Sequence, residues 1–93
     1  MQRRDNYRYN YISTAITTQI HTGQGQLIAI VIGTTAAGAI QIIDNTSGTT
    51  TNIGELQSSI LPGTYEFECT YTVGLRIITA AASKITVIYS PIG

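Results

Sequence analysis

The segment at residues 27–32 reads Leu-Ile-Ala-Ile-Val-Ile and is apolar at every position, in a chain that otherwise alternates apolar and polar residues. Successive side chains of a strand point to opposite faces, so both faces of this strand need cover. One face packs against a second sheet of the same domain. A small domain has little chain left for the other face, and the simplest cover is a second copy. The predicted oligomer-interface residues are Leu27, Ile28, Ile30, Val31 and Ile32.

Length and charge limit the number of domains and the kinds of partner that the chain can have. The chain has 93 residues, which is enough for one domain. Only 11% of the residues are charged, against about 25% in average soluble domains. The formal net charge of zero gives no overall attraction to nucleic acid or to an anionic membrane, and it does not oppose self-association. No apolar run approaches the roughly 18 residues of a membrane helix, so we expect no membrane span.

Strand-forming residues dominate the chain, and no helical periodicity is found. Ile, Val, Thr and Tyr recur, and clusters of Gly, Pro, Asn and Asp separate the apolar segments. Strands are predicted at about 11–22, 26–33, 39–44, 52–57, 64–72, 75–79 and 84–90. The fold class is therefore all-β: a small antiparallel β-sandwich or jelly roll of about seven to eight strands. We expect a single sandwich domain over 12–93, preceded by an extended N-terminal arm over 1–11.

The strand at 64–72 has the clearest alternation. Tyr65, Phe67, Cys69 and Tyr71 share one side, and the other side is polar. The predicted core consists of Tyr65, Phe67, Leu75, Ile77, Ile85, Val87 and Tyr89. Cys69 is the only cysteine, so an internal disulfide is excluded, and a buried inert thiol is expected.

The N-terminal segment holds three of the five basic residues, interleaved with tyrosines. Arginine and tyrosine are favoured at protein interfaces, so we expect the arm to dock on a neighbouring protein. Nucleic-acid binding through arginine on phosphate and tyrosine on bases is a second interpretation, and a disordered tail is a third. The predicted partner-binding residues are Arg3, Arg4, Tyr7, Arg8, Tyr9 and Tyr11.

Four motifs resemble a known group of proteins. They are the stretch from Gly25-Gln26-Leu27 to Asp44-Asn45-Thr46-Ser47-Gly48, the segment Leu61-Pro62-Gly63-Thr64-Tyr65-Glu66-Phe67, the corner Gly74-Leu75-Arg76-Ile77, and the final Ile85-Thr86-Val87-Ile88-Tyr89. Over about residues 13–90 this pattern resembles small structural proteins of tailed bacteriophages. The resemblance implies a β-sandwich, often trimeric, that serves as a capsid decoration protein, a head fibre or a tail part.

No set of residues indicates catalysis, a metal or a cofactor. His21 is the only histidine and lies in a different segment from Cys69, whereas zinc needs three or four ligands. Glu66 and Glu68 share a strand face about 6.6 Å apart, within the range of about 5–9.5 Å found in glycosidases. Both fall on the polar side, where carboxylates keep a sheet soluble, so no catalytic residue is predicted.

These observations predict a non-enzymatic virion protein. We expect a capsid decoration or cement protein that is made in the host cytoplasm and forms a homo-oligomer, a trimer by preference. Its expected partner is the outer surface of the major capsid protein or another virion protein. A tail, neck or fibre module is an alternative. A carbohydrate-binding module that uses exposed tyrosines on a loop rim is another.

Overall fold

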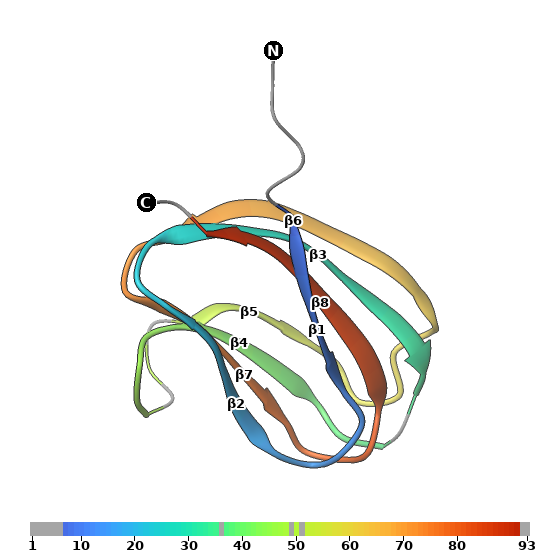
Figure 1. The fold of residues 1–93 in the computed structure, drawn as a ribbon. Coiled ribbons are helices and arrows are strands. Elements are labelled where there is room, and N and C mark those ends of the chain that lie inside the picture. Colours follow the sequence, from blue (N-terminus) through green and yellow to red (C-terminus); the bar gives the residue numbers. More distant parts are fainter. Residues whose placement is uncertain (1–6, 36, 49, 51, 92–93) are drawn as a thin grey trace.

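The computed structural model describes residues 7–35, 37–48, 50 and 52–91, which form two antiparallel sheets of four strands each (Figure 1). The described residues contain no helix, so the expected all-β class is confirmed. In chain order the strands are β1 (Arg8–Ile12), β2 (Thr17–Thr22), β3 (Gly25–Thr34), β4 (Ile40–Asp44), β5 (Asn52–Leu56), β6 (Gly63–Tyr71), β7 (Gly74–Thr79) and β8 (Lys84–Pro91). The first sheet has the order β1-β8-β3-β6 and the second β2-β7-β4-β5.

The pairing pattern is that of a long hairpin wrapped into two layers. β1 pairs with β8, β2 with β7, β3 with β6 and β4 with β5, always antiparallel. Two further pairings, β3 with β8 and β4 with β7, join the hairpin into complete sheets. Eight strands in this order define a jelly roll, one of the two architectures predicted from the sequence.

The expected first strand at 11–22 is wrong, because this segment forms two strands in different sheets. β1 lies at an edge of the first sheet and β2 at an edge of the second. The chain crosses between the sheets at a corner held by Thr79. Its hydroxyl donates to the carbonyl of Thr14 at 2.6 Å and accepts from the backbone N–H of Ile16 at 3.0 Å.

The predicted arm at 1–11 also needs correction. Residues 8–11 belong to β1, whose register runs from Arg8 opposite Tyr89 to Ile12 opposite Ile85. The sandwich therefore begins before residue 12. Ile12 is the only aliphatic residue of β1 and is buried in the core, so the sequence of this strand carries almost no alternation that would reveal it. Residues 1–6 lie outside the described part of the chain.

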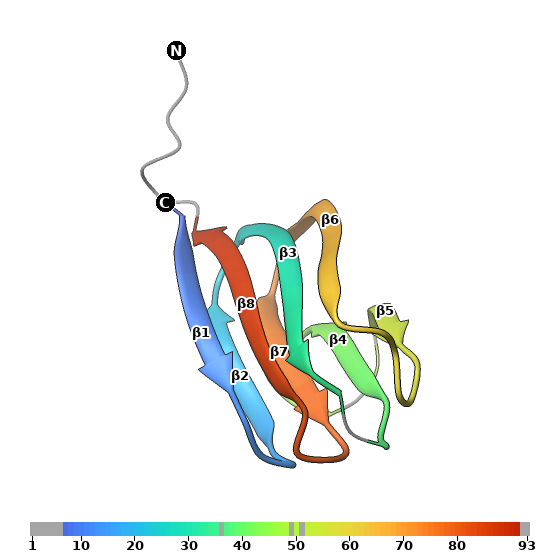
Figure 2. The same cartoon turned by 90° about the vertical axis from the view of Figure 1, so that its right-hand side faces the viewer.

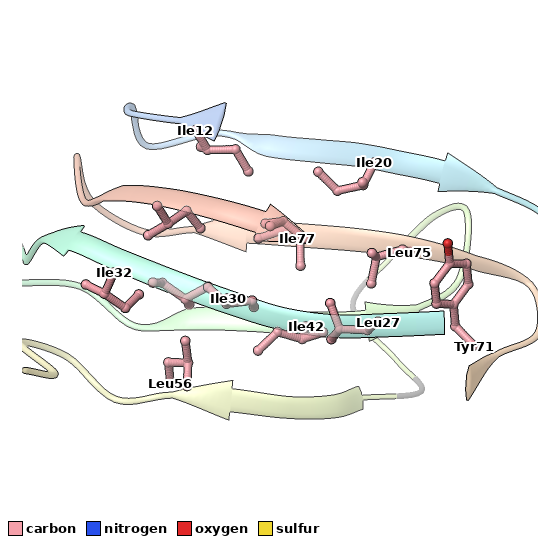
Figure 3. Packing of buried hydrophobic residues seen from close by; sticks show 13 residues of the cluster. Ile12, Ile20, Leu27, Ile30, Ile32, Ile42, Leu56, Tyr71, Leu75 and Ile77 are labelled. Carbon is pink, nitrogen blue, oxygen red and sulfur yellow. The ribbon is translucent and has the colours of Figure 1, made fainter. Parts of the chain in front are cut away.

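The core fills the space between the two sheets with branched aliphatic side chains and the ring of Tyr71 (Figure 3). It consists of Ile12, Ile20, Leu27, Ile30, Ile32, Ile40, Ile42, Leu56, Tyr71, Leu75, Ile77, Ile85 and Val87. This confirms the predicted core positions in β7 and β8, namely Leu75, Ile77, Ile85 and Val87. Tyr65, Phe67 and Tyr89 face the same space but pack against the margin of the cluster, where they are only half-buried.

A bulge in β3 decides which residues of the apolar segment enter the core. Leu27 and Ala29 lie opposite Tyr89 and Ile88 of β8, so Ile28 is an extra residue in β3. An extra residue reverses the alternation beyond it. Leu27, Ile30 and Ile32 consequently all reach the core of the same subunit, and their prediction as interface residues is wrong. Ile28 and Val31 lie outside the core cluster and are half-buried.

The two sides of β7 offer a direct test of this packing. Ile77 is fully buried in the core, whereas its neighbour Ile78 is half-buried on the opposite side of the strand. Ile77→Ala should lower the free energy of unfolding by about 2–5 kcal/mol because it leaves a cavity. Ile78→Ala should cost less than half as much. Urea denaturation of both variants measures the difference, and equal losses would contradict the assigned strand phase.

Candidate functional site

The outer face of the first sheet carries apolar and aromatic side chains in two rows that cross all four strands. The strand register gives one row as Tyr9, Ile88, Ala29 and Glu66, and the next as Tyr11, Thr86, Val31 and Thr64. We call the apolar members, Tyr9, Tyr11, Ala29, Val31 and Ile88, the apolar face. It begins at edge strand β1 and ends at β3, because Glu66 and Thr64 replace apolar residues on β6.

The apolar face is most accessible at β1. Tyr9 exposes 76% of its surface and Tyr11 57%, while Ala29, deeper in the sheet, exposes only 5%. Tyrosine combines a large apolar ring with a hydroxyl that donates a hydrogen bond, so it contributes strongly to protein interfaces. The β1 end of the apolar face is therefore the part suited to receive a partner.

The outer face of the second sheet has a different character. Its two rows are Thr17, Ile78, Gln41 and Glu55, and Gln19, Arg76, Ile43 and Asn52. Arg76 donates to Gln19 Oε1 at 3.0 Å and to the carbonyls of Gly48 and Thr46 at 3.2 and 3.4 Å. Its charge is thus used within the subunit, and this polar face needs no partner to satisfy it.

At one end of the sandwich a histidine pairs with a buried tyrosine. His21 Nδ1 lies 2.8 Å from the hydroxyl of Tyr71, and its ring lies 6.0 Å from that of Tyr89. Burial, followed by the electrostatic effects of Tyr89 and Asp44, raises the pKa of Tyr71 to about 12. The phenol therefore stays protonated at neutral pH and can donate to the imidazole. His21 is thus tied into the packing of the sandwich.

Asp44 clamps the turn between β6 and β7 at the same end. Its carboxylate accepts from the N–H groups of Thr72, Val73 and Gly74 at 2.8–3.2 Å, and from the Thr72 hydroxyl at 3.2 Å. Partial burial alone would raise the pKa of Asp44, but these hydrogen bonds outweigh it and hold the pKa below the ordinary value of 3.8. The sequence indicated only a turn at 44–48, and it gave no sign of a partner 28 residues away.

Of the predicted arm residues, Tyr7, Arg8, Tyr9 and Tyr11 are all exposed, and the structure gathers them at the start of β1 and along it. Arg3 and Arg4 lie outside the described residues.

Glu66 and Glu68 are exposed on β6, as the polar side of that strand predicted. Glu68 adopts a φ of 47°, an unusual backbone conformation for a residue other than glycine.

Cys69 is half-buried against the core rather than fully buried. Burial and then the charge of Asp44 raise the pKa of its thiol, which keeps the sulfur protonated and unreactive.

Within the described part of the chain, no group of three His, Cys, Asp or Glu side chains is placed to hold a metal ion, and no pocket is present. Nor does that part of the chain include a helix able to span a membrane.

Together these features define an eight-stranded jelly-roll sandwich with one apolar and one polar outer face. No protein-family model and no curated protein sequence matches the chain. Among solved structures it resembles the NLP core of Drosophila, whose structure bears on pentamer formation and histone binding. The TM-score is 0.60 at 6% identity, over 95% of this chain and 99% of that one. This likeness shows a shared fold.

A second solved structure is more distant. NovW, a 4-keto-6-deoxy sugar epimerase of Streptomyces spheroides, matches with a TM-score of 0.43 and 13% identity. The match covers 94% of this chain but only 46% of the epimerase.

The Asp44 clamp predicts a pH-dependent contribution to stability. A carboxylate whose pKa is lowered on folding stabilises the protein above its unfolded pKa, and this contribution is lost as the pH falls through the folded value. Asp44→Asn should lower the free energy of unfolding by about 1 kcal/mol at pH 7, and the loss should shrink below pH ~4. Denaturation curves at several pH values test this. Glu55→Gln, which changes an exposed carboxylate of β5, is the control, and a loss independent of pH would contradict the clamp.

Gly25 should be intolerant of any side chain. A Cβ at this position would overlap the hydroxyl of Tyr71 and lie 2.6 Å from its Cζ, and the hydroxyl is already committed to His21. Gly25→Ala should therefore destabilise the protein by about 1–3 kcal/mol through overpacking. Gly33→Ala on the same strand is the matched control, because its Cβ would meet nothing closer than 3.6 Å. Thermal unfolding compares them, and equal midpoints would refute the predicted overlap.

Proposed function

We propose that this chain is a non-enzymatic structural subunit that assembles with copies of itself on a bacteriophage virion, as a capsid decoration protein. The observation that carries the proposal is the apolar face, with Tyr9 and Tyr11 exposed by 76% and 57% in the isolated subunit. An exposed surface of this kind, next to edge strand β1, is typical of an interaction site. The partner on the virion is the outer surface of the major capsid protein or another virion protein.

The asymmetry of the sandwich supports assembly through the first sheet. On the second sheet, Arg76 already bonds to groups of its own subunit. On the first sheet, the rings of Tyr9 and Tyr11 have no comparable cover. Burial contributes about 25 cal/mol per Å² of apolar surface, while association costs about 4–15 kcal/mol. A stable contact therefore needs more of the face than two tyrosines, and Val31 and Ile88 continue it.

The fold and the sequence resemblance support the same assignment. Jelly rolls recur in viral capsid and lectin domains, although a shared fold alone does not establish a function. The motifs that resemble phage structural proteins fall on β3, β4, β6, β7 and β8, which form most of the sandwich. A homotrimer is the preferred assembly. The pentamer associated with the Drosophila NLP core makes five copies the second possibility.

The alternatives gain nothing specific from the structure. A carbohydrate-binding module was expected to present tyrosines on a loop rim, but Tyr9 and Tyr11 lie within a strand. A tail, neck or fibre module would use the same apolar face, and only its location in the virion differs from that of a decoration protein. The particle experiment below separates these locations.

The apolar face should control self-association. At micromolar concentration the protein should sediment as an oligomer, and the double variant Tyr9→Ser, Tyr11→Ser should shift it toward monomer. Leu61→Ser is the matched control, because Leu61 exposes 76% of its surface in the loop before β6, outside the two rows of this sheet face. A wild-type protein that remains monomeric, or an oligomer indifferent to both tyrosines, would count against the proposal.

The virion assignment requires a separate experiment. Particles purified from a culture that expresses the gene should contain the protein in many copies, as counted by quantitative mass spectrometry. A reconstruction should place its density on the outside of the capsid shell, at the local symmetry axes. Density on the tail, neck or a fibre would move the protein to that site. Absence from particles, with the protein abundant in the lysate, would reject the virion role.

A further inference from the structure

We infer that the partner across the first sheet is a second copy of this chain placed head to tail, with the β1 edge of one copy against the β6 edge of the next. This inference rests on the proposed function, since it assumes that the chain assembles with itself. It adds the orientation of the contact and the residues on each side. The two edges are different surfaces, so the contact is heterologous, and repeating it generates a closed ring when the rotation between copies closes.

Opposite charges occupy the two edges of the first sheet. The order β1-β8-β3-β6 leaves β1 and β6 as edge strands, which Figure 2 shows on opposite sides of the sheet. Arg8 lies on β1, and Glu66 and Glu68 lie on β6. All three are exposed, and none of these side chains has a hydrogen-bond or ion-pair partner among the described residues.

The other charges of the described chain contribute little to this pattern. Asp44 and Arg76 are engaged inside the subunit, with the β6–β7 turn and with Gln19 and neighbouring carbonyls. Glu55 belongs to the second sheet, and Lys84 lies at the start of the interior strand β8. The unpaired charges at the two edges of the first sheet are therefore one basic and two acidic groups, which complement each other across a contact between copies.

The strand register places Tyr9 and Glu66 at matching levels on the two edges. Tyr9 lies opposite Ile88, Ile88 opposite Ala29, and Ala29 opposite Glu66, so Tyr9 and Glu66 end the same row on the two edges. A rotation without translation, as in a closed ring, brings the β1 end of this row to the β6 end of the next copy. The Tyr9 hydroxyl can then donate to the Glu66 carboxylate. Arg8 belongs to the next row, which runs through Tyr89 and Leu27 to Cys69 beside Glu68 and points to the opposite face of the sheet.

Strand direction and backbone shape are compatible with this contact. Three successive antiparallel pairings leave β1 and β6 running in opposite directions. Neighbouring edges of adjacent copies are then antiparallel, like all pairs within the sheet. The bulge between β3 and β6 and the positive φ of Glu68 distort the β6 edge, which discourages full strand pairing. The contact is therefore made by side chains.

A two-fold contact between like edges is disfavoured by the same charges. Placing β6 against β6 brings Glu66 and Glu68 toward those of the other copy, and placing β1 against β1 brings no acidic group toward Arg8. Like charges across an interface repel, and the cost rises as they are desolvated. Only the head-to-tail arrangement sets the basic edge against the acidic edge.

Charge reversal followed by restoration tests the inference. Arg8→Glu alone and the pair Glu66→Arg, Glu68→Arg should each raise the dissociation constant of the oligomer about tenfold or more at low ionic strength. The triple variant that combines them restores opposite signs at every contact, and its dissociation constant should return to within about threefold of the wild-type value. Sedimentation velocity over a concentration series measures all four proteins.

Lys84→Glu and Glu55→Arg are the matched controls, since each reverses an exposed charge that lies on neither edge strand of the first sheet. Neither should change the dissociation constant appreciably. Circular dichroism checks that each variant is folded. If a charge-reversal variant does not fold, the milder substitutions Arg8→Gln and Glu66→Gln are measured in its place. The Gln variants should weaken assembly in the same direction by a smaller factor.

The outcomes separate this inference from the proposed function. If the wild-type protein is monomeric at every concentration, the proposed assembly itself fails. If the wild-type protein assembles but the reversals leave the dissociation constant unchanged, only the head-to-tail geometry is overturned. The same conclusion follows if the dissociation constant of the triple variant is as high as that of the Arg8→Glu variant or of the Glu66→Arg, Glu68→Arg variant. Recovery in the triple variant, with both controls unaffected, supports the head-to-tail contact.

Discussion

The central position of β3, with its bulge at Ile28, is the constraint on which the first sheet depends. β3 pairs with β8 on one side and β6 on the other. A change of register in β3 therefore alters which of its side chains lie beside those of both neighbouring strands. The bulge lets Leu27 and Ile30 both enter the core, where they fill the space between the sheets. It also leaves Ala29 and Val31 on the outer face, and this makes that face apolar across several strands. The core and the interaction surface thus arise from the same local irregularity.

Low charge content gives the few charged residues distinct roles. Asp44 holds the β6–β7 turn through backbone N–H groups, and Arg76 joins the second sheet to the carbonyls of Thr46 and Gly48. These groups stabilise the subunit itself. Arg8, Glu66 and Glu68 are exposed at the sheet edges, where charge protects free strands from non-specific pairing. In the proposed ring the same charges would also select the correct neighbour, so that protection and specificity come from one arrangement.

One end of the sandwich combines polar contacts with dense packing. Tyr71 is completely buried, yet its hydroxyl meets His21, so burial leaves no unsatisfied polar atom at this position. Gly25 permits this because even a methyl group there would occupy the place of the phenol. The only histidine of the chain therefore has a structural role that its isolation in the sequence did not reveal. Contacts of this kind involve residues tens of positions apart.

The sequence by itself determined the all-β class, the approximate limits of most strands and the alternation in β6, β7 and β8. These properties are local, because strand propensity, turn residues and the period of two are read within a few residues. Leu75, Ile77, Ile85 and Val87 were identified as core residues for this reason. The phase of 27–32 was not predictable, since every residue there is apolar and the bulge is visible only against β8. The division of 11–22 into β1 and β2 likewise depends on pairing with β8 and β7 and on the Thr79 corner, 63 residues from Ile16. Only the tertiary structure decided these points, because they depend on which distant strands become neighbours.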